Sequence, residues 1–229
     1  IGRAVIKSIK QFLILSLLAV NSAHASVSEK TIAIFDFDNN SFMDIARVDY
    51  LQRVLPEMLL AQLRNIPGIK MIERVQLKAA LEELKLGSGD LADKDSQLKL
   101  GKILGAKNMM FGSFMAIGNQ LRLDVRVIEV ETSLTLLSEG QEANIDDLMP
   151  TIDNIAKVIS NKLGMKGMAK ASKGTSQEVW KLFDKGIVLM DKKKYEEAIA
   201  IFQQVLEKDP KFDIAEQRII QSLEKIESQ

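Results

Sequence analysis

Short apolar segments alternate with amphipathic helical segments between residues 31 and 163, and this order limits the possible folds more than any other feature of the chain. Strands are expected where β-branched and apolar residues lie between turn-forming ones, at 31–37, 69–72, 108–114, 121–128 and 134–139. Helices are expected where apolar residues recur every three or four positions, at 48–63, 75–86, 96–104 and 145–163. The region is therefore predicted to form an α/β domain.

Three positions interrupt these regular patterns. The strict alternation of the strand that begins at Leu121 slips at Val127-Ile128, which predicts a β-bulge. Pro56 lies inside the first helical pattern, so it is expected to kink that helix or to start a second one. Pro150 indicates that the last helix of the region begins near this residue.

Histidine and cysteine are almost absent from the chain. The sequence contains no cysteine and a single histidine, His24. Zinc sites need these residue types as ligands, and Ser-His or Cys-His pairs need histidine as the base. We therefore expect no metal site, no cofactor and no catalytic site of these kinds. Chemistry based on carboxylates or lysine, and loops that bind phosphate, remain open.

The first 25 residues have the layout of an export signal. Three basic residues precede the apolar run Phe12–Val20, and Ala23-His24-Ala25 follows it. The run is shorter than the roughly 20 residues of a membrane-spanning helix. We expect cleavage before Ser26 and a location in the periplasm, the space bounded by the outer membrane. Three of the 31 basic residues lie in this segment, which leaves 28 against 31 acidic ones, so no nucleic-acid partner is indicated.

The last third of the chain is predicted to be helical and separate. Residues 166–177, KGMAKASKGTSQ, are small and polar and predict a linker. The expected domains are therefore the signal peptide 1–25, an α/β domain 26–165, the linker 166–177 and a helical domain 178–229. Within the helical domain, residues 214–226 predict an added helix that caps the two helices before it.

The two helices before this cap resemble one tetratricopeptide repeat. Gly186, Tyr195, Ala198, Phe202 and Pro210 have the spacing of that repeat. In such a hairpin the small residues let two antiparallel helices approach, the aromatic residue fills the gap, and the proline ends the second helix. An unrelated helical hairpin is the alternative interpretation.

A lone hairpin cannot bury both of its faces, yet this one is rich in aromatic residues. We expect Trp180, Phe183 and Phe212 to form a candidate interaction surface. They could pack on residues 30–163 or contact another chain. The linker favours the second arrangement, because nothing in it fixes the angle between the domains. The sequence therefore predicts self-association, as a homo-oligomer, or binding of another envelope protein.

Four motifs in order resemble the CsgG-type family, that of the curli secretion component and its periplasmic relatives. They are IAIFDFD at 32–38, MIERVQL at 71–77, LGKILGAKNMMFGSF at 100–114 and LDVRVIEVET at 123–132. The resemblance implies a small mixed β-sheet flanked by helices, a periplasmic or outer-membrane-associated location, and no catalytic residues. The chain lacks the lipidated cysteine of the pore-forming member and has no room for membrane hairpins after Gly112 or Glu139. We therefore do not expect it to form a pore or to span a membrane.

Other polar motifs have structural explanations. Asp36 and Asp38 follow a strand, where a metal could bind, but a role in a turn or cap is the simpler interpretation. Gly87-Ser88-Gly89 lacks the lysine and hydroxyl ending of a P-loop and predicts the end of a helix. A structural role, as an ion pair or as a cap where a strand meets a helix, is expected for Glu73-Arg74, and pairing across one strand face is expected among Arg122, Asp124 and Arg126.

Two classes of function follow from these observations. The first is a non-enzymatic accessory protein for assembly or secretion, which binds other envelope proteins through the repeat and the α/β domain. The second is an enzyme that acts on the cell wall with carboxylates alone. That enzyme would need two carboxylates on either side of a cleft, and no aromatic residues accompany a candidate pair. The first class is preferred.

Overall fold

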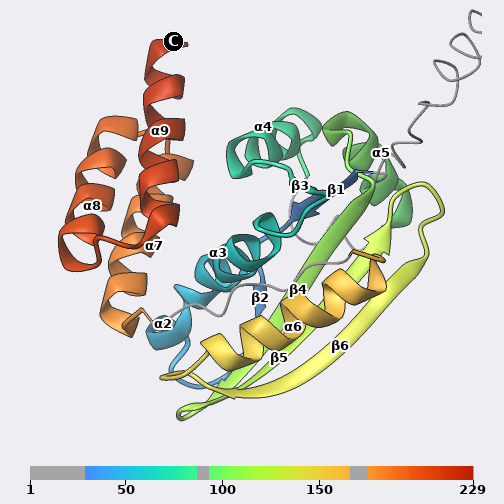
Figure 1. The fold of residues 1–229 in the computed structure, drawn as a ribbon, viewed down its shortest axis with the longest axis horizontal. Coiled ribbons are helices and arrows are strands. Elements are labelled where there is room, and N and C mark those ends of the chain that lie inside the picture. Colours follow the sequence, from blue (N-terminus) through green and yellow to red (C-terminus); the bar gives the residue numbers. More distant parts are fainter. Residues whose placement is uncertain (1–28, 87–92, 166–174, 229) are drawn as a thin grey trace, which may run out of the picture.

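The computed structural model describes residues 29–86, 93–165 and 175–228 (Figure 1). The expected export signal, Gly87–Gly89 and most of the expected linker lie outside the described residues. The described strands are β1 (Lys30–Ile34), β2 (Asp38–Asn39), β3 (Ile69–Met71), β4 (Asn108–Ile117), β5 (Gln120–Glu129) and β6 (Thr135–Asn144). The described helices are α2 (Ile45–Val48), α3 (Leu51–Arg64), α4 (Arg74–Leu84), α5 (Lys94–Leu104), α6 (Met149–Lys162), α7 (Gln177–Asp191), α8 (Tyr195–Lys208) and α9 (Asp213–Glu227).

The described strands form one mixed sheet in the order β3-β1-β4-β5-β6, with β2 beside β4. β1 runs parallel to β3 and β4, whereas β4, β5 and β6 are joined as antiparallel hairpins. The register of β5 and β6 shifts between Val127 and Ile128, as the slip in the alternation predicts. β4 and β6 extend past their predicted ends, to Ile117 and Asn144, because each continues to pair with β5 there.

Helices cover the two faces of the sheet unequally. α3 and α6 pack on one face, over a core that includes Ile32, Met110 and Leu123. α4 and α5 cover the other face over β1 and β4, where Phe35 and Met109 are buried. The predicted small mixed sheet with flanking helices is confirmed.

The part of the sheet that α4 and α5 leave uncovered is polar. Arg122 and Asp124 form an exposed ion pair at 2.9 Å on β5. Arg126 does not join them and lies over the ring of Phe111, 5.6 Å from its centroid. The expected pairing across this face is therefore present for two of the three residues.

Pro56 neither ends α3 nor starts a second helix. Proline has no N–H, so the carbonyl of Gln52, four residues earlier, loses its helical donor. The backbone N–H of Phe37 donates to this carbonyl at 2.8 Å instead. The lost helical bond is thus replaced by one that fixes the segment between β1 and β2 against α3.

The C-terminal helical region, residues 175–228, is a hairpin of α7 and α8 with α9 packed against α8. Figure 1 shows these three helices beside the α/β domain, next to α3 and α4. Gly186 on α7 lies directly against the ring of Phe202 on α8. The predicted hairpin with an added helix is confirmed. None of the described helices is both long enough and apolar enough to cross a membrane.

Candidate interaction site

The aromatic side chains of the helical region are buried within the chain. Trp180, Phe183 and Phe212 are at most 5% exposed, and their ring centroids lie 4.7–5.8 Å apart in pairs. Tyr195 and Phe202 are buried as well. The expectation of an exposed surface at Trp180, Phe183 and Phe212 is therefore corrected: Phe212, at the start of α9, packs back onto α7, and α3 contacts α7.

The helical region also packs on the α/β domain, contrary to the expectation drawn from the linker. One continuous apolar cluster contains residues of α3 and α6 together with residues of α7, α8 and α9. Ion pairs reinforce this contact, which we call the junction. The composition of a connecting segment says nothing about whether the surfaces on either side of it are complementary, which is why the linker was misleading.

Arg74, at the start of α4, is the centre of one polar contact across the junction. Its buried guanidinium donates to both carboxylate oxygens of Asp36, just after β1. It also donates to both oxygens of Asp191, the last residue of α7, at 2.7 and 3.0 Å. Lys78 donates to Asp36 at 2.7 Å. This arrangement joins the sheet, α4 and α7.

Asp36 is held in its ionised form by these cations. Burial alone would raise the pKa of Asp36, but the charges and hydrogen bonds of Arg74 and Lys78 lower it to about 2. Asp38 lies apart, exposed on β2. The oxygens of Asp36 are thus occupied by protein donors, and the two aspartates do not form a shared cation site. The described residues contain no group of three or more His, Cys, Asp or Glu side chains placed so that they could hold a metal ion.

Asp36 is expected to make the stability of the chain depend on acid pH. The pKa of Asp36 is lower in the folded chain, so the unfolded chain binds the proton first as the pH falls. The stabilisation from Asp36 is therefore complete above about pH 4 and is lost as the pH falls toward 2. Asp36→Asn should cost about 1–2 kcal/mol in urea unfolding near pH 6 and clearly less near pH 2.5. Asp38→Asn is the matched control and should show no such change. Equal costs for Asp36→Asn at both pH values would contradict this.

A second polar contact across the junction surrounds Arg218 on α9. Its side chain is 1% exposed and donates to Glu57 on α3, itself 3% exposed, at 2.5 Å. Arg218 also lies 3.5 Å from Glu73, which accepts a further hydrogen bond from Gln221. Burial of both charges makes this pair sensitive to the loss of either partner. Glu73 and Arg74 therefore both have the structural role that the sequence predicts.

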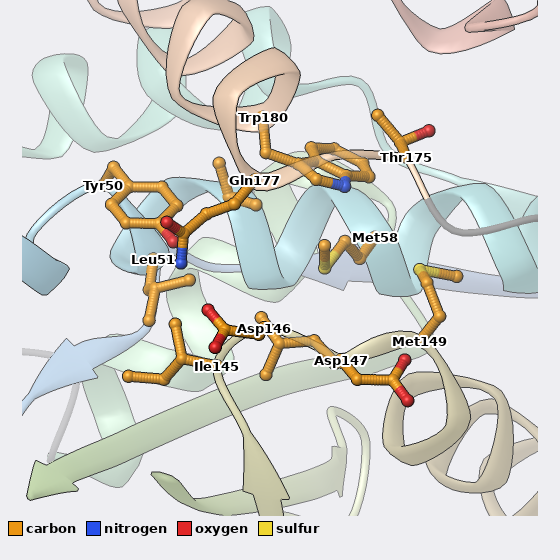
Figure 2. A pocket seen from close by; sticks show the side chains of 12 residues that line it. Tyr50, Leu51, Met58, Ile145, Asp146, Asp147, Met149, Thr175, Gln177 and Trp180 are labelled. Carbon is orange, nitrogen blue, oxygen red and sulfur yellow. The ribbon is translucent and has the colours of Figure 1, made fainter. Parts of the chain in front are cut away.

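A small pocket lies where α3, the β6–α6 connection and α7 meet (Figure 2). Its volume of about 40 Å³ fits a water molecule rather than a substrate. Figure 2 shows Asp146 beneath Tyr50 and Gln177, with Trp180 above Met58. The indole N–H of Trp180 is buried and has no hydrogen-bond partner among the described residues. Burial raises the pKa of Tyr50 to about 12, so its hydroxyl remains a hydrogen-bond donor.

Next to this pocket, large apolar side chains are exposed at one end of the sheet. Phe42, Met43 and Ile45 lie between β2 and the first turn of α2, and Ile117 ends β4. We call these four residues the apolar end. Most large apolar side chains of the described chain are buried in the core, whereas these four are exposed to solvent. This makes them a candidate contact for another molecule.

Hydrogen bonds hold the loop of the apolar end against β4. The N–H of Asn40 donates to the carbonyl of Phe114 at 2.8 Å, and the N–H of Ala116 donates to the hydroxyl of Ser41 at 2.9 Å. Arg47 donates to the carbonyl of Gly118 in the β4–β5 turn. The loop and the turn are therefore fixed as one surface, and Figure 1 shows α2, the β4–β5 turn and the start of α7 at the same end of the molecule.

This surface was missed in the sequence because residues 42–45 lie between the expected strand at 31–37 and the expected helix at 48–63. A signal is visible in retrospect: three large apolar residues directly follow the turn-forming residues at 38–41, before any helical pattern begins. Arg218 was missed for a related reason. It shares the buried stripe of α9 with Ile214, Ala215 and Ser222, and a charged residue on an apolar stripe indicates a buried partner.

Comparison with known proteins gives one family match. Residues 14–122 match the family model described as Curli production assembly/transport component CsgG. This CsgG match confirms the resemblance that the motifs at 32–38, 71–77 and 100–114 indicate. It covers less than half of the chain and does not reach the helical region, whose tetratricopeptide resemblance stays a prediction.

Solved structures of low sequence identity also match the chain. No curated protein matches the chain. The LpoB C-terminal domain from Escherichia coli is 16% identical, with 58% of this chain and 94% of that chain covered and a TM-score of 0.39. Lipoprotein GNA1162 from Neisseria meningitidis is 12% identical, with 58% and 96% covered and a TM-score of 0.44. TolB from Acinetobacter baumannii is 12% identical, with 59% and 28% covered and a TM-score of 0.38.

Proposed function

We propose that the chain is a non-enzymatic accessory protein of a Gram-negative-type envelope, which binds other envelope proteins during assembly or secretion. The observation that carries this proposal is the match of residues 14–122 to a family described as an assembly and transport component. The expected export signal before Ser26 supports a periplasmic or outer-membrane-associated location. We further propose that residues 178–229 form a tetratricopeptide-like unit on an α/β domain of residues 26–165.

The placement of the carboxylates at the junction supports binding over catalysis. Asp36 and Asp191 share the guanidinium of Arg74, and Glu57 binds Arg218. Carboxylates that are fully engaged by cations hold parts of the chain together and are poor general acids. A carboxylate-dependent enzyme acting on the cell wall remains the alternative, and release of sugar fragments from purified cell wall by the wild-type chain would favour it.

The proposal predicts export and specific contacts in the envelope. Protein recovered from the envelope fraction should begin at Ser26. A photo-crosslinking residue placed in turn at three exposed positions, Phe42, Leu134 and Leu223, should capture a defined envelope protein from at least one of them. Uncleaved protein in the cytosol, or only random products at all three positions, would contradict the proposal.

A further inference from the structure

Among the described residues, the largest group of exposed large apolar side chains lies at the apolar end. Phe42, Met43, Ile45 and Ile117 are 69%, 63%, 52% and 57% exposed. Four other large apolar residues of similar exposure lie in other parts of the described chain: Ile103 on α5, Leu134 just before β6, and Ile220 and Leu223 three positions apart on α9. A group of this kind on a rigidly held loop marks a contact surface, since single exposed apolar residues need no explanation but a cluster does.

The charges around the apolar end are mostly negative. Asp38, Asp44 and Asp146 are exposed there, and none of them forms an ion pair with another described residue, whereas Asp49 pairs with Arg53 at 3.2 Å. Asp146 belongs to this end because Asn119, in the β4–β5 turn, donates to it.

Two arginines of the described chain lie near these carboxylates, Arg53 beside Asp49 and Arg47 beside the β4–β5 turn. The Arg47 side chain donates to the carbonyl of Gly118 and is thus engaged by the β4–β5 turn. The rim of the apolar end is therefore an anionic surface with few internal counter-charges.

We propose that the apolar end binds a basic amphipathic segment of another protein, one that carries lysine or arginine side chains beside large apolar ones. Apolar contact would supply most of the affinity, and the acidic rim would select the sign of the partner's charge. The rim has the same sign as anionic lipid headgroups, which disfavours a membrane surface as the occupant. This inference rests on the proposed binding function and names the kind of partner for one surface.

The test uses the full exported chain and a synthetic probe. The probe is a fluorescent amphipathic peptide of about 15 leucine and lysine residues, compared with a peptide in which glutamate replaces each lysine. The lysine peptide should bind and the glutamate peptide should not. Phe42→Ser/Met43→Ser should weaken binding about tenfold or more. Leu134→Ser/Leu223→Ser, which removes equally apolar and similarly exposed side chains elsewhere, should leave it unchanged.

Charge is tested by Asp44→Asn/Asp146→Asn, which should weaken binding and reduce its dependence on salt. Asparagine suits position 44 because the backbone there has a φ of 50°, which asparagine tolerates. Equal binding of both peptides, or full binding by Phe42→Ser/Met43→Ser, would overturn the inference. So would binding of phosphatidylglycerol vesicles through Phe42 and Met43. If crosslinks form from Leu134 or Leu223 but not from Phe42, the inference fails and the proposed function stands.

Discussion

Replacing Glu57 with leucine is expected to destabilise the chain by about 3–5 kcal/mol, because it leaves the charge of Arg218 buried without its closest partner. Both side chains are almost completely buried, and they join α3 to α9 across the junction. Urea unfolding followed by circular dichroism and by the emission of Trp180, the only tryptophan, measures the loss. The tryptophan signal reports on α7 in particular.

The double variant Glu57→Leu/Arg218→Leu separates the loss of a charge partner from the loss of packing. It removes both charges, so it should recover most of the stability that Glu57→Leu loses. Glu82→Ala, which breaks the exposed ion pair with Lys193 across the same junction, should have no measurable effect. A double variant as unstable as Glu57→Leu alone would show that the ion pair is not the cause.

Much of the fold could be predicted because hydrophobic periodicity reports the type of each element directly. The alternation that begins at Leu121 predicts β5, and its slip at Val127-Ile128 predicts the register shift with β6. The apolar stripe through Ile152, Ile155 and Ile159 predicts α6 in the same way. These patterns are local, so they need no knowledge of what the element packs against.

The junction could not be predicted because its contacts join residues that are far apart in the sequence. Arg218 and Glu57 are separated by 161 positions, and Arg74 and Asp191 by 117. Arg218 carries a local signal, its place on the buried stripe of α9, but this signal does not show which residue it pairs with. Propensity therefore predicted the helices of the helical region correctly but not the surface on which they dock.

The apolar end was also not predicted, for a different reason. A large apolar residue in a loop is normally covered by some other part of the fold, and the sequence does not show which residues stay uncovered. Phe37 and Phe42 illustrate this, since they lie five positions apart and neither belongs to a strand or helix of the structure. Phe37 is 1% exposed and Phe42 is 69% exposed. Only the three-dimensional arrangement separates a core residue from a candidate contact.

Substitutions at the contact of Gly186 with Phe202 are also expected to change the free energy of unfolding by several kcal/mol. Phe202→Ala is expected to cost about 3–5 kcal/mol, because the ring is fully buried between α7 and α8. Gly186→Ala should also destabilise the wild-type chain, by about 1–3 kcal/mol. A Cβ at residue 186 would overlap the Phe202 ring, with two ring carbons at 2.8 Å and a third closer still. Trp180 emission in urea again measures both losses.

The change in stability caused by Gly186→Ala should have the opposite sign when Phe202 is replaced by alanine. In the Phe202→Ala background the new methyl group has room, and alanine is favoured over glycine in a helix by about 1 kcal/mol. Gly186→Ala should therefore stabilise Phe202→Ala while it destabilises the wild-type chain. A loss of similar size in both backgrounds would mean that something other than the ring limits the size of residue 186. The close approach of α7 and α8, on which the tetratricopeptide resemblance depends, would then need another explanation.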